Sequence, residues 1–141
     1  MPILTPNFHF ANRRCAQAIE LYKRAFGAEV TCLLTGDDAN PADWRAENEM
    51  QRQMVYHAEM IICGQRVLMS DADYDIDSAR HGLSLVVTFD SADEVRAAFA
   101  ILAEGGTMRD PMHSTSYSSC FVSLIDRYGM RWELMTEQTD R

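Results

Sequence analysis

The sequence has no long apolar run and no closely spaced pair of cysteines. No apolar stretch approaches the ~18 residues that a membrane-spanning helix needs, and residues 1–6 have neither the basic start nor the apolar core of a signal peptide. The four cysteines, at positions 15, 32, 63 and 120, form no C-x-x-C motif, which argues against a zinc knuckle or a redox dithiol. We therefore expect a cytoplasmic protein with no membrane partner.

Basic residues are also few. The net charge is −8, from 13 Lys and Arg against 21 Asp and Glu, and the arginines are scattered rather than gathered in a stripe. Such a chain would repel a phosphate backbone, so nucleic acid is not an expected partner. The remaining composition, 47% hydrophobic and 24% charged over 141 residues, is that of one globular domain covering residues 1–141.

The first half of the chain has the pattern of a βαβββ module. Apolar residues at the 3.6-residue spacing predict a helix over 12–26, with Asn12 as its N-cap and Gly27 as its C′ residue. Besides a short first strand at 7–10, apolar and alternating segments predict strands at 29–35, 55–62 and 66–70. Residues 36–53 are predicted to form a long loop, and residues 71–82 a solvated linker.

The second half repeats this order. A strand is predicted at 83–89 and a helix over 92–103, which begins at the N-cap Ser91. Three more strands are predicted at 107–113, 117–125 and 131–136. The two halves, about 1–75 and 83–141, are therefore two βαβββ modules, and a repeat of this kind determines the fold.

Several motifs resemble one known family. They are Phe8-x-Phe10-x-Asn12, Ala25-Phe26-Gly27-Ala28, His57-Ala58-Glu59, Leu68-Met69-Ser70-Asp71, Thr115-x-Tyr117 and Asp126-Arg127-Tyr128-Gly129. Together they resemble the phosphonate-operon B-type branch of the glyoxalase, bleomycin-resistance and dioxygenase superfamily, also called vicinal oxygen chelate. Members of this branch are sometimes described as 3-demethylubiquinone methyltransferase-like, although nothing in the sequence resembles a methyl-donor site.

The resemblance spans nearly the whole chain and implies its architecture. It implies an α+β fold in which the two modules form a curved, eight-stranded mixed sheet around a cavity, with the helices outside. It also implies a homodimer that binds a small molecule. It does not identify the reaction, because one fold carries many chemistries.

Alternation along the strands sorts side chains between the helices and the cavity. On the first strand Phe8 and Phe10 are expected under the helix, and Thr5, Asn7 and His9 are expected to face the cavity. The cavity set, drawn from both halves, is Thr5, Asn7, His9, His57, Glu59, Ser70, Ser84, Thr88 and Glu133. Tyr117 is a candidate aromatic wall of the same pocket.

The resemblance also implies four metal-ligand positions, which read Thr5, Leu68, Ser84 and Glu133 here. Only Glu133 is a good ligand for a divalent transition metal, since hydroxyls bind weakly and leucine not at all. We therefore expect neither a resident metal nor another cofactor.

His9, His57 and Glu133 are the candidate catalytic residues, and Thr5, Asn7, Glu59, Ser70, Ser84, Thr88 and Tyr117 the candidate ligand-binding residues. His57 beside Glu59 suits a general base or a displaced metal site, but also a structural pair in which Glu59 reaches Arg66.

The sequence favours a small-molecule-binding protein with a degenerate metal site, and it leaves open whether the protein is an enzyme. The alternative is a metal-dependent lyase, isomerase or dioxygenase with a rearranged set of His9, His57, Glu59 and Glu133. A third possibility is a dimeric interaction module with a vestigial cavity.

Overall fold

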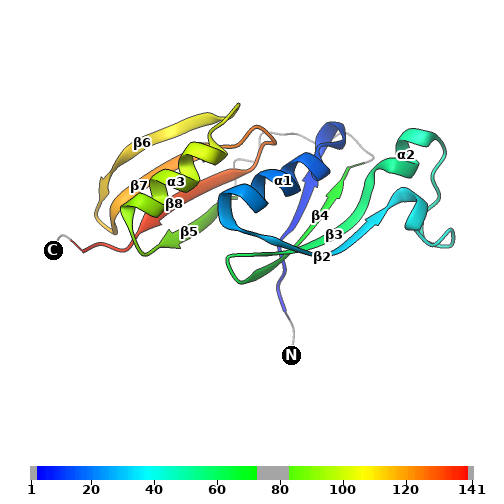
Figure 1. Cartoon of the computed structure of the whole chain (residues 1–141), viewed down its shortest axis with the longest axis horizontal. Helices are drawn as coiled ribbons and strands as arrows, with labels where there is room; N and C mark the ends of the chain where they lie inside the picture. The colour runs from blue at the N-terminus through cyan, green and yellow to red at the C-terminus, as the bar shows by residue number, and fades with distance from the viewer. Residues whose placement is uncertain (1–2, 73–82, 140–141) are drawn as a thin grey trace. The chain divides into compact units, whose positions relative to one another are not determined.

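The computed structural model describes residues 3–72 and 83–139 and divides the chain into two compact units, residues 1–76 (unit 1) and 77–141 (unit 2). The elements of unit 1, in order, are β1 (Asn7–Phe10), η1 (Ala11–Arg13), α1 (Cys15–Phe26), β2 (Glu29–Thr35), η2 (Gly36–Asp38), α2 (Glu49–Gln53), β3 (Val55–Ile62) and β4 (Gln65–Asp71) (Figure 1). The strands form one sheet in the order β1-β4-β3-β2, in which β1 runs parallel to β4 and the other pairs are antiparallel.

Unit 2 repeats this plan. Its elements are β5 (Leu85–Phe89), α3 (Ala92–Leu102), β6 (Thr107–Thr115), β7 (Ser118–Ile125) and β8 (Arg131–Thr136). The sheet order is β5-β8-β7-β6, again with one parallel pair, β5 and β8, and two antiparallel pairs. The predicted α+β class and the two βαβββ modules are confirmed. Among the described residues, the eight strands pair as two four-stranded sheets, one in each unit.

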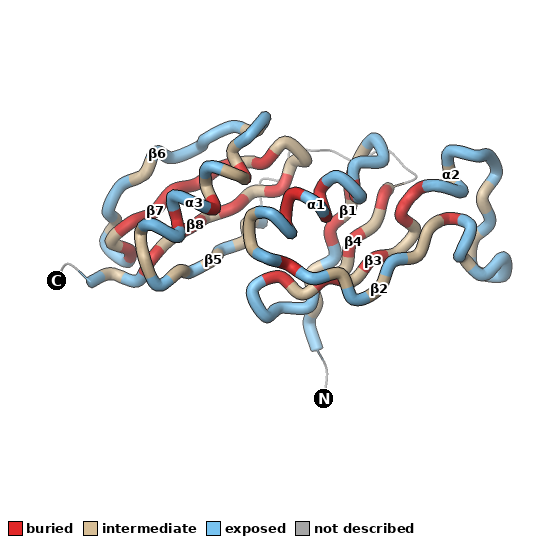
Figure 2. The backbone as a smooth tube through the Cα atoms, viewed as in Figure 1, coloured by how far each residue is buried: buried red, intermediate tan, exposed pale blue. Residues whose placement is uncertain are grey.

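One face of each sheet forms the core with the helix of its own unit. In unit 1 Phe8 and Phe10 are buried, and the Phe8 ring meets the Tyr22 ring of α1 edge to face at 6.4 Å. In unit 2 Trp132 and Leu134 are buried on the face that packs on α3. Figure 2 shows buried positions alternating with half-buried ones along β3, β4 and β8. None of the helices within the described residues is long and apolar enough to span a membrane.

The start of α1 differs from the prediction. Asn12 is not its N-cap, because residues 11–13 form the 3-10 turn η1, in which Asn12 has a φ of 58°. The helix begins at Cys15, whose backbone N–H donates to the Asp71 carboxylate at 2.9 Å. A side chain from β4 therefore binds the helix start in place of a local cap. Burial and the nearby Asp71 charge also raise the pKa of the Cys15 thiol.

Two other expectations are corrected. Asp71 is not part of a solvated linker: it is the last residue of β4, buried, and its second carboxylate oxygen accepts from the Val55 N–H at 2.8 Å. The expected loop over 36–53 contains the helix α2, capped by the Asn48 side chain, which accepts from the Gln51 N–H. Residues 73–82 of the expected linker lie outside the described residues. The predicted C′ residue Gly27 is confirmed, with a left-handed φ of 63°.

Candidate functional site

The candidate site residues of unit 1 lie on the sheet face opposite α1. The strand register sets Asn7 of β1 beside Leu68 of β4, and Leu68 beside Glu59 of β3. In the next row His9 pairs with Ser70. Neighbouring residues on the same strands, such as Phe8, Ala58 and Met69, are buried on the α1 side. The side-chain parity predicted for these strands is therefore the parity observed.

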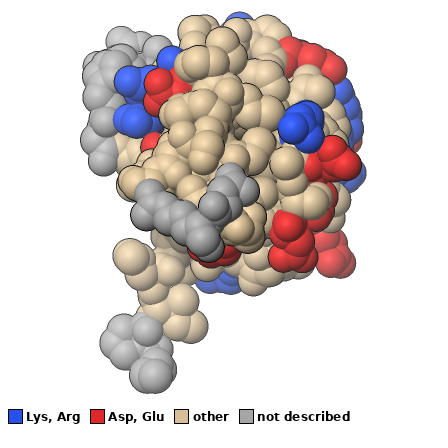
Figure 3. Space-filling model, turned by 90° about the vertical axis from the view of Figure 1, so that its left-hand side faces the viewer, with Lys and Arg blue, Asp and Glu red and all other residues tan. Residues whose placement is uncertain are grey.

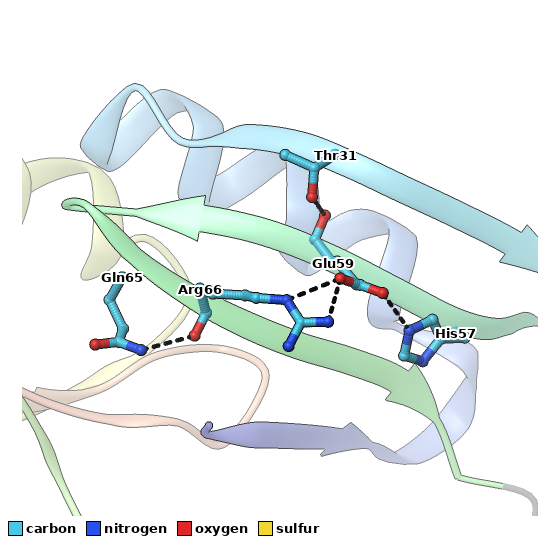
Figure 4. Close-up of polar contacts among 5 residues, drawn as sticks. All are labelled: Thr31, His57, Glu59, Gln65 and Arg66. Atoms are coloured by element: carbon cyan, nitrogen blue, oxygen red, sulfur yellow. Dashed lines mark hydrogen bonds and ion pairs between the residues drawn. The ribbon is translucent and has the colours of Figure 1, made fainter. Parts of the chain in front are cut away.

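His57, Glu59 and Arg66 form a linked group on this face (Figure 4). The Nε2 atom of His57 lies 2.9 Å from one Glu59 carboxylate oxygen. The Arg66 guanidinium donates to the other oxygen from Nε, also at 2.9 Å, and from Nη2. The hydrogen bond with His57, and next that with Arg66, lower the pKa of the Glu59 carboxyl. Glu59 is therefore a carboxylate at neutral pH that holds the imidazole in place.

This group has the chemistry of an oriented base. Because an ionised carboxylate only accepts, the contact requires a proton on Nε2 of His57, and in the neutral form of the imidazole Nδ1 is then an acceptor. The His57 side chain is 34% exposed and that of Glu59 is 21% exposed, so solutes can reach the imidazole. The contact of Arg66 with Glu59 is the structural ion pair expected from the sequence as an alternative. An ion pair that fixes Glu59 also positions His57.

A second polar pair lies on the same face. The Nδ1 atom of His9 and the Ser70 hydroxyl are 3.2 Å apart, which joins β1 to β4. Both residues are partly exposed. Thr5, also partly exposed, precedes β1, and Asn7 is exposed at the start of that strand. The structure thus places six predicted residues in unit 1, and hydrogen bonds join four of them in two pairs.

In unit 2 the predicted residue Glu133 lies on β8. Its carboxylate accepts from the Ser84 hydroxyl at 3.2 Å, and Arg131 approaches it at 3.8 Å. Sequence reasoning missed Ser123, which faces Glu133 across β7 and β8. Ser123 is 2% exposed, and its hydroxyl has no hydrogen-bond partner within the described chain. A serine inside the apolar segment 120–125 was the signal that could have identified it.

Thr88 and Tyr117 take other positions. Thr88 is exposed on β5 and lines a hollow at the end of the unit 2 sheet. Tyr117 is 56% exposed in the turn between β6 and β7, with its ring edge to face on Phe121 at 6.0 Å. Within the described residues neither side chain hydrogen-bonds to Glu133 or Ser84, so Thr88 and Tyr117 are not part of that hydrogen-bonded group.

The residues at the four positions that the resemblance implies for metal ligands do not suit a divalent metal. Leu68 has no donor atom, and Thr5 and Ser84 offer only neutral hydroxyls. Glu133 has a guanidinium beside its carboxylate, whose positive charge opposes a metal cation. Within residues 3–72 and 83–139, no three His, Cys, Asp or Glu side chains are grouped as a metal site requires.

Comparison with known proteins agrees with this architecture. A family model described as 3-demethylubiquinone-9 3-methyltransferase matches residues 3–135. Protein YjdN of Escherichia coli K12 is 28% identical over 135 residues, which cover 92% of this chain and 91% of that protein. The solved PhnB protein from Bacillus cereus superposes with a TM-score of 0.75 at 24% identity, covering 96% of this chain and 99% of that one.

A more distant structure has the same fold. The glyoxylase, bleomycin resistance protein and dioxygenase domain from Frankia sp. EAN1pec superposes with a TM-score of 0.66 at 12% identity, and 98% of each chain is covered. This likeness shows that the two βαβββ modules have the fold of that domain. The chain belongs to the family described as 3-demethylubiquinone-9 3-methyltransferase, whose model matches most of its length.

Proposed function

We propose that this protein binds a small molecule on the polar face of the unit 1 sheet, without a resident metal ion. The observation that carries the proposal is the fixed, partly exposed group of His57, Glu59 and Arg66 on a sheet whose other face packs on α1. Polar groups already held by hydrogen bonds lose little freedom when a ligand binds.

The face suits a ligand that is partly polar and partly apolar. The imidazole of His57 and the His9–Ser70 pair supply donors and acceptors. Leu68, half-buried, lies in the row between Asn7 and Glu59 and supplies an apolar contact. A small molecule with one apolar part flanked by hydrogen-bonding groups would match this arrangement.

The proposal that no metal is bound rests on the side chains at the four implied ligand positions. Leu68 and the two hydroxyls leave Glu133 as one good ligand, and Arg131 lies beside it. The rival function is a metal-dependent lyase, isomerase or dioxygenase that uses His9, His57, Glu59 and Glu133 instead. Elemental analysis of the purified protein separates the two, because about one metal per chain, lost in His57→Ala or Glu133→Gln, would establish the rival.

Binding alone and acid–base catalysis remain distinct versions of the proposal. His57 with Glu59 behind it has the arrangement of a general base. The family description names a methyl transfer, but the sequence has no motif that resembles a methyl-donor site. If His57 is a base, His57→Gln should abolish turnover of an identified substrate while its binding stays nearly intact. A binding protein would lose affinity alone.

We also propose that the protein is a homodimer, since each sheet has edge strands whose backbone groups are open to pairing. Sedimentation of a 16.0 kDa monomer at micromolar concentration would contradict the dimer.

The direct test is to identify what the protein retains during purification. Wild-type protein, His9→Ala, Glu59→Gln and the control Glu29→Gln, an exposed change on β2, are purified in parallel and denatured. Mass spectrometry then compares the small molecules released. A compound present at about one per chain in the wild type and control, but reduced in both site variants, supports the proposal. A compound equally retained by all four proteins contradicts it.

A further inference from the structure

Unit 2 contains a hollow of about 500 Å³ at one end of its sheet. The end of β5, the start of α3 and the end of β8 meet there (Figure 1). Its volume lies within the roughly 300–1,000 Å³ typical of small-molecule pockets. All of its lining residues belong to unit 2, and neither His57 nor Glu133 is among them. It is therefore separate from the group at which the proposed function is placed.

Thr136 gives this hollow an unsatisfied polar group. It is the last residue of β8, is 7% exposed, and its hydroxyl has no hydrogen-bond partner in the described part of the chain. Its register partner is Phe89, the last residue of β5. A buried hydroxyl without a partner is unfavourable, so a ligand that reached it would gain a hydrogen bond.

The corresponding position in unit 1 is filled. There Asp71 ends β4 and pairs in register with Phe10, the last residue of β1. Its carboxylate accepts from the backbone N–H groups of Cys15 and Val55, which joins the start of the helix to the sheet. The Thr136 side chain is too short to make the equivalent bonds in unit 2. The hollow lies beside Thr136, at the position equivalent to that of Asp71 in unit 1.

The charge at the hollow selects the kind of ligand. Asp90 and Glu137, both exposed, line it, and among its described lining residues none is Lys, Arg or His. Phe89, Ala92 and Cys120 supply apolar surface beside these carboxylates. Figure 3 shows the acidic side chains, in red, on one face of the molecule, where several lie along the right-hand side of the view. Two carboxylates without a basic neighbour in the lining favour a cation over an anion.

We propose that this hollow binds a small aliphatic amine in its protonated form. Its ammonium group pairs with Asp90 and Glu137, its carbon chain lies on Phe89 and Cys120, and a polar group at its inner end bonds to the Thr136 hydroxyl. This is a second site, independent of the group around His57, so the failure of either proposal leaves the other standing.

The test is a titration of the ¹⁵N-labelled full-length chain followed by NMR, with 1,4-diaminobutane as the probe. The uncharged 1,4-butanediol and the dianion succinate, at equal ionic strength, are the comparison compounds. The diamine is expected to give saturable shifts at the amides of Asp90, Ala92 and Thr136, and the other two compounds are not. Shifts of equal size with butanediol, or shifts that never saturate, would overturn the proposal.

Variants make the assignment specific. The double variant Asp90→Asn with Glu137→Gln should weaken diamine binding about tenfold, as expected for the loss of two exposed ion pairs. Thr136→Val should weaken it severalfold. The control Asp37→Asn with Glu29→Gln removes the same charge from exposed positions of unit 1 and should leave the affinity unchanged. If Thr136→Val binds like the wild type, or if the control weakens binding as much as the site double variant, the proposal is wrong.

Discussion

The two units share one topology but connect their helices to their sheets differently. In unit 1 the buried Asp71 carboxylate joins the start of α1 to β3 through two backbone hydrogen bonds. In unit 2 the Ser91 hydroxyl caps α3 locally, and the counterpart of Asp71 is Thr136, whose hydroxyl is unpaired within the described residues. Two modules with the same fold can therefore be stabilised by different hydrogen bonds. Among the described residues, unit 1 has no buried side-chain polar atom without a partner, whereas unit 2 has the hydroxyls of Ser123 and Thr136.

The largest effect is expected from Asp71→Ala. Two buried N–H groups would lose their acceptor, so the free energy of unfolding should fall by roughly 2–5 kcal/mol. Asp71→Asn keeps one acceptor oxygen and should lose about half as much. Hydrogen exchange localises the loss, because amides of α1 should exchange faster while those of α3 change little. Equal acceleration in both helices would mean that the carboxylate does not act on unit 1 alone.

Thr136→Val should raise the free energy of unfolding, the opposite of the effect of Asp71→Ala. Replacing a buried hydroxyl that has no partner by a methyl group removes a desolvation penalty, so we expect a gain of about 1 kcal/mol in the free energy of unfolding. Ser118→Ala is the matched control, since the Ser118 hydroxyl is also buried but bonds to the backbone N–H and C=O of Cys120. The control should destabilise. Urea denaturation of both variants checks the pair, and a loss in Thr136→Val would show that its hydroxyl has a partner in solution.

The smallest effect concerns pH and Glu59. Its pKa is lowered in the folded state, so its stabilising contribution is complete above the unfolded value of about 4.5 and disappears as the pH falls through the folded pKa. Glu59→Gln should therefore lose less stability than the wild type in this acid range. Glu20→Gln, exposed on α1, controls for the loss of one charge. Identical acid profiles for the wild type and Glu59→Gln would show that the contacts with His57 and Arg66 do not persist in solution.

Much of this architecture is readable from the sequence. β2 and β3 were predicted with the observed bounds, because their apolar segments end at clear turn residues. The two-residue turn at Cys63-Gly64 fixes the hairpin register, and this register places Glu59 and Ser70 on the polar face. The fold class and the side-chain faces of the β3–β4 hairpin therefore follow from local rules.

Other features depend on contacts between distant residues. The start of α1 was misplaced because its acceptor is 56 residues away, whereas cap prediction considers neighbours. Asp71 looked like a linker residue because carboxylates are usually solvated. Ser123 escaped notice for a related reason, since burial of its hydroxyl beside Glu133 depends on the pairing of β7 with β8. Periodicity thus identifies faces, but not which polar groups on them find partners.

The central claim, that the polar face of unit 1 binds a small molecule without a metal, has one direct test. A library of small polar molecules is screened by NMR against ¹⁵N-labelled protein that has been treated with a chelator. We expect some of them to give saturable shifts centred on His9, His57, Glu59 and Ser70, and Glu59→Gln to weaken these shifts. Binding that appears at these residues only after zinc or manganese is added, or binding that never involves them, would contradict it.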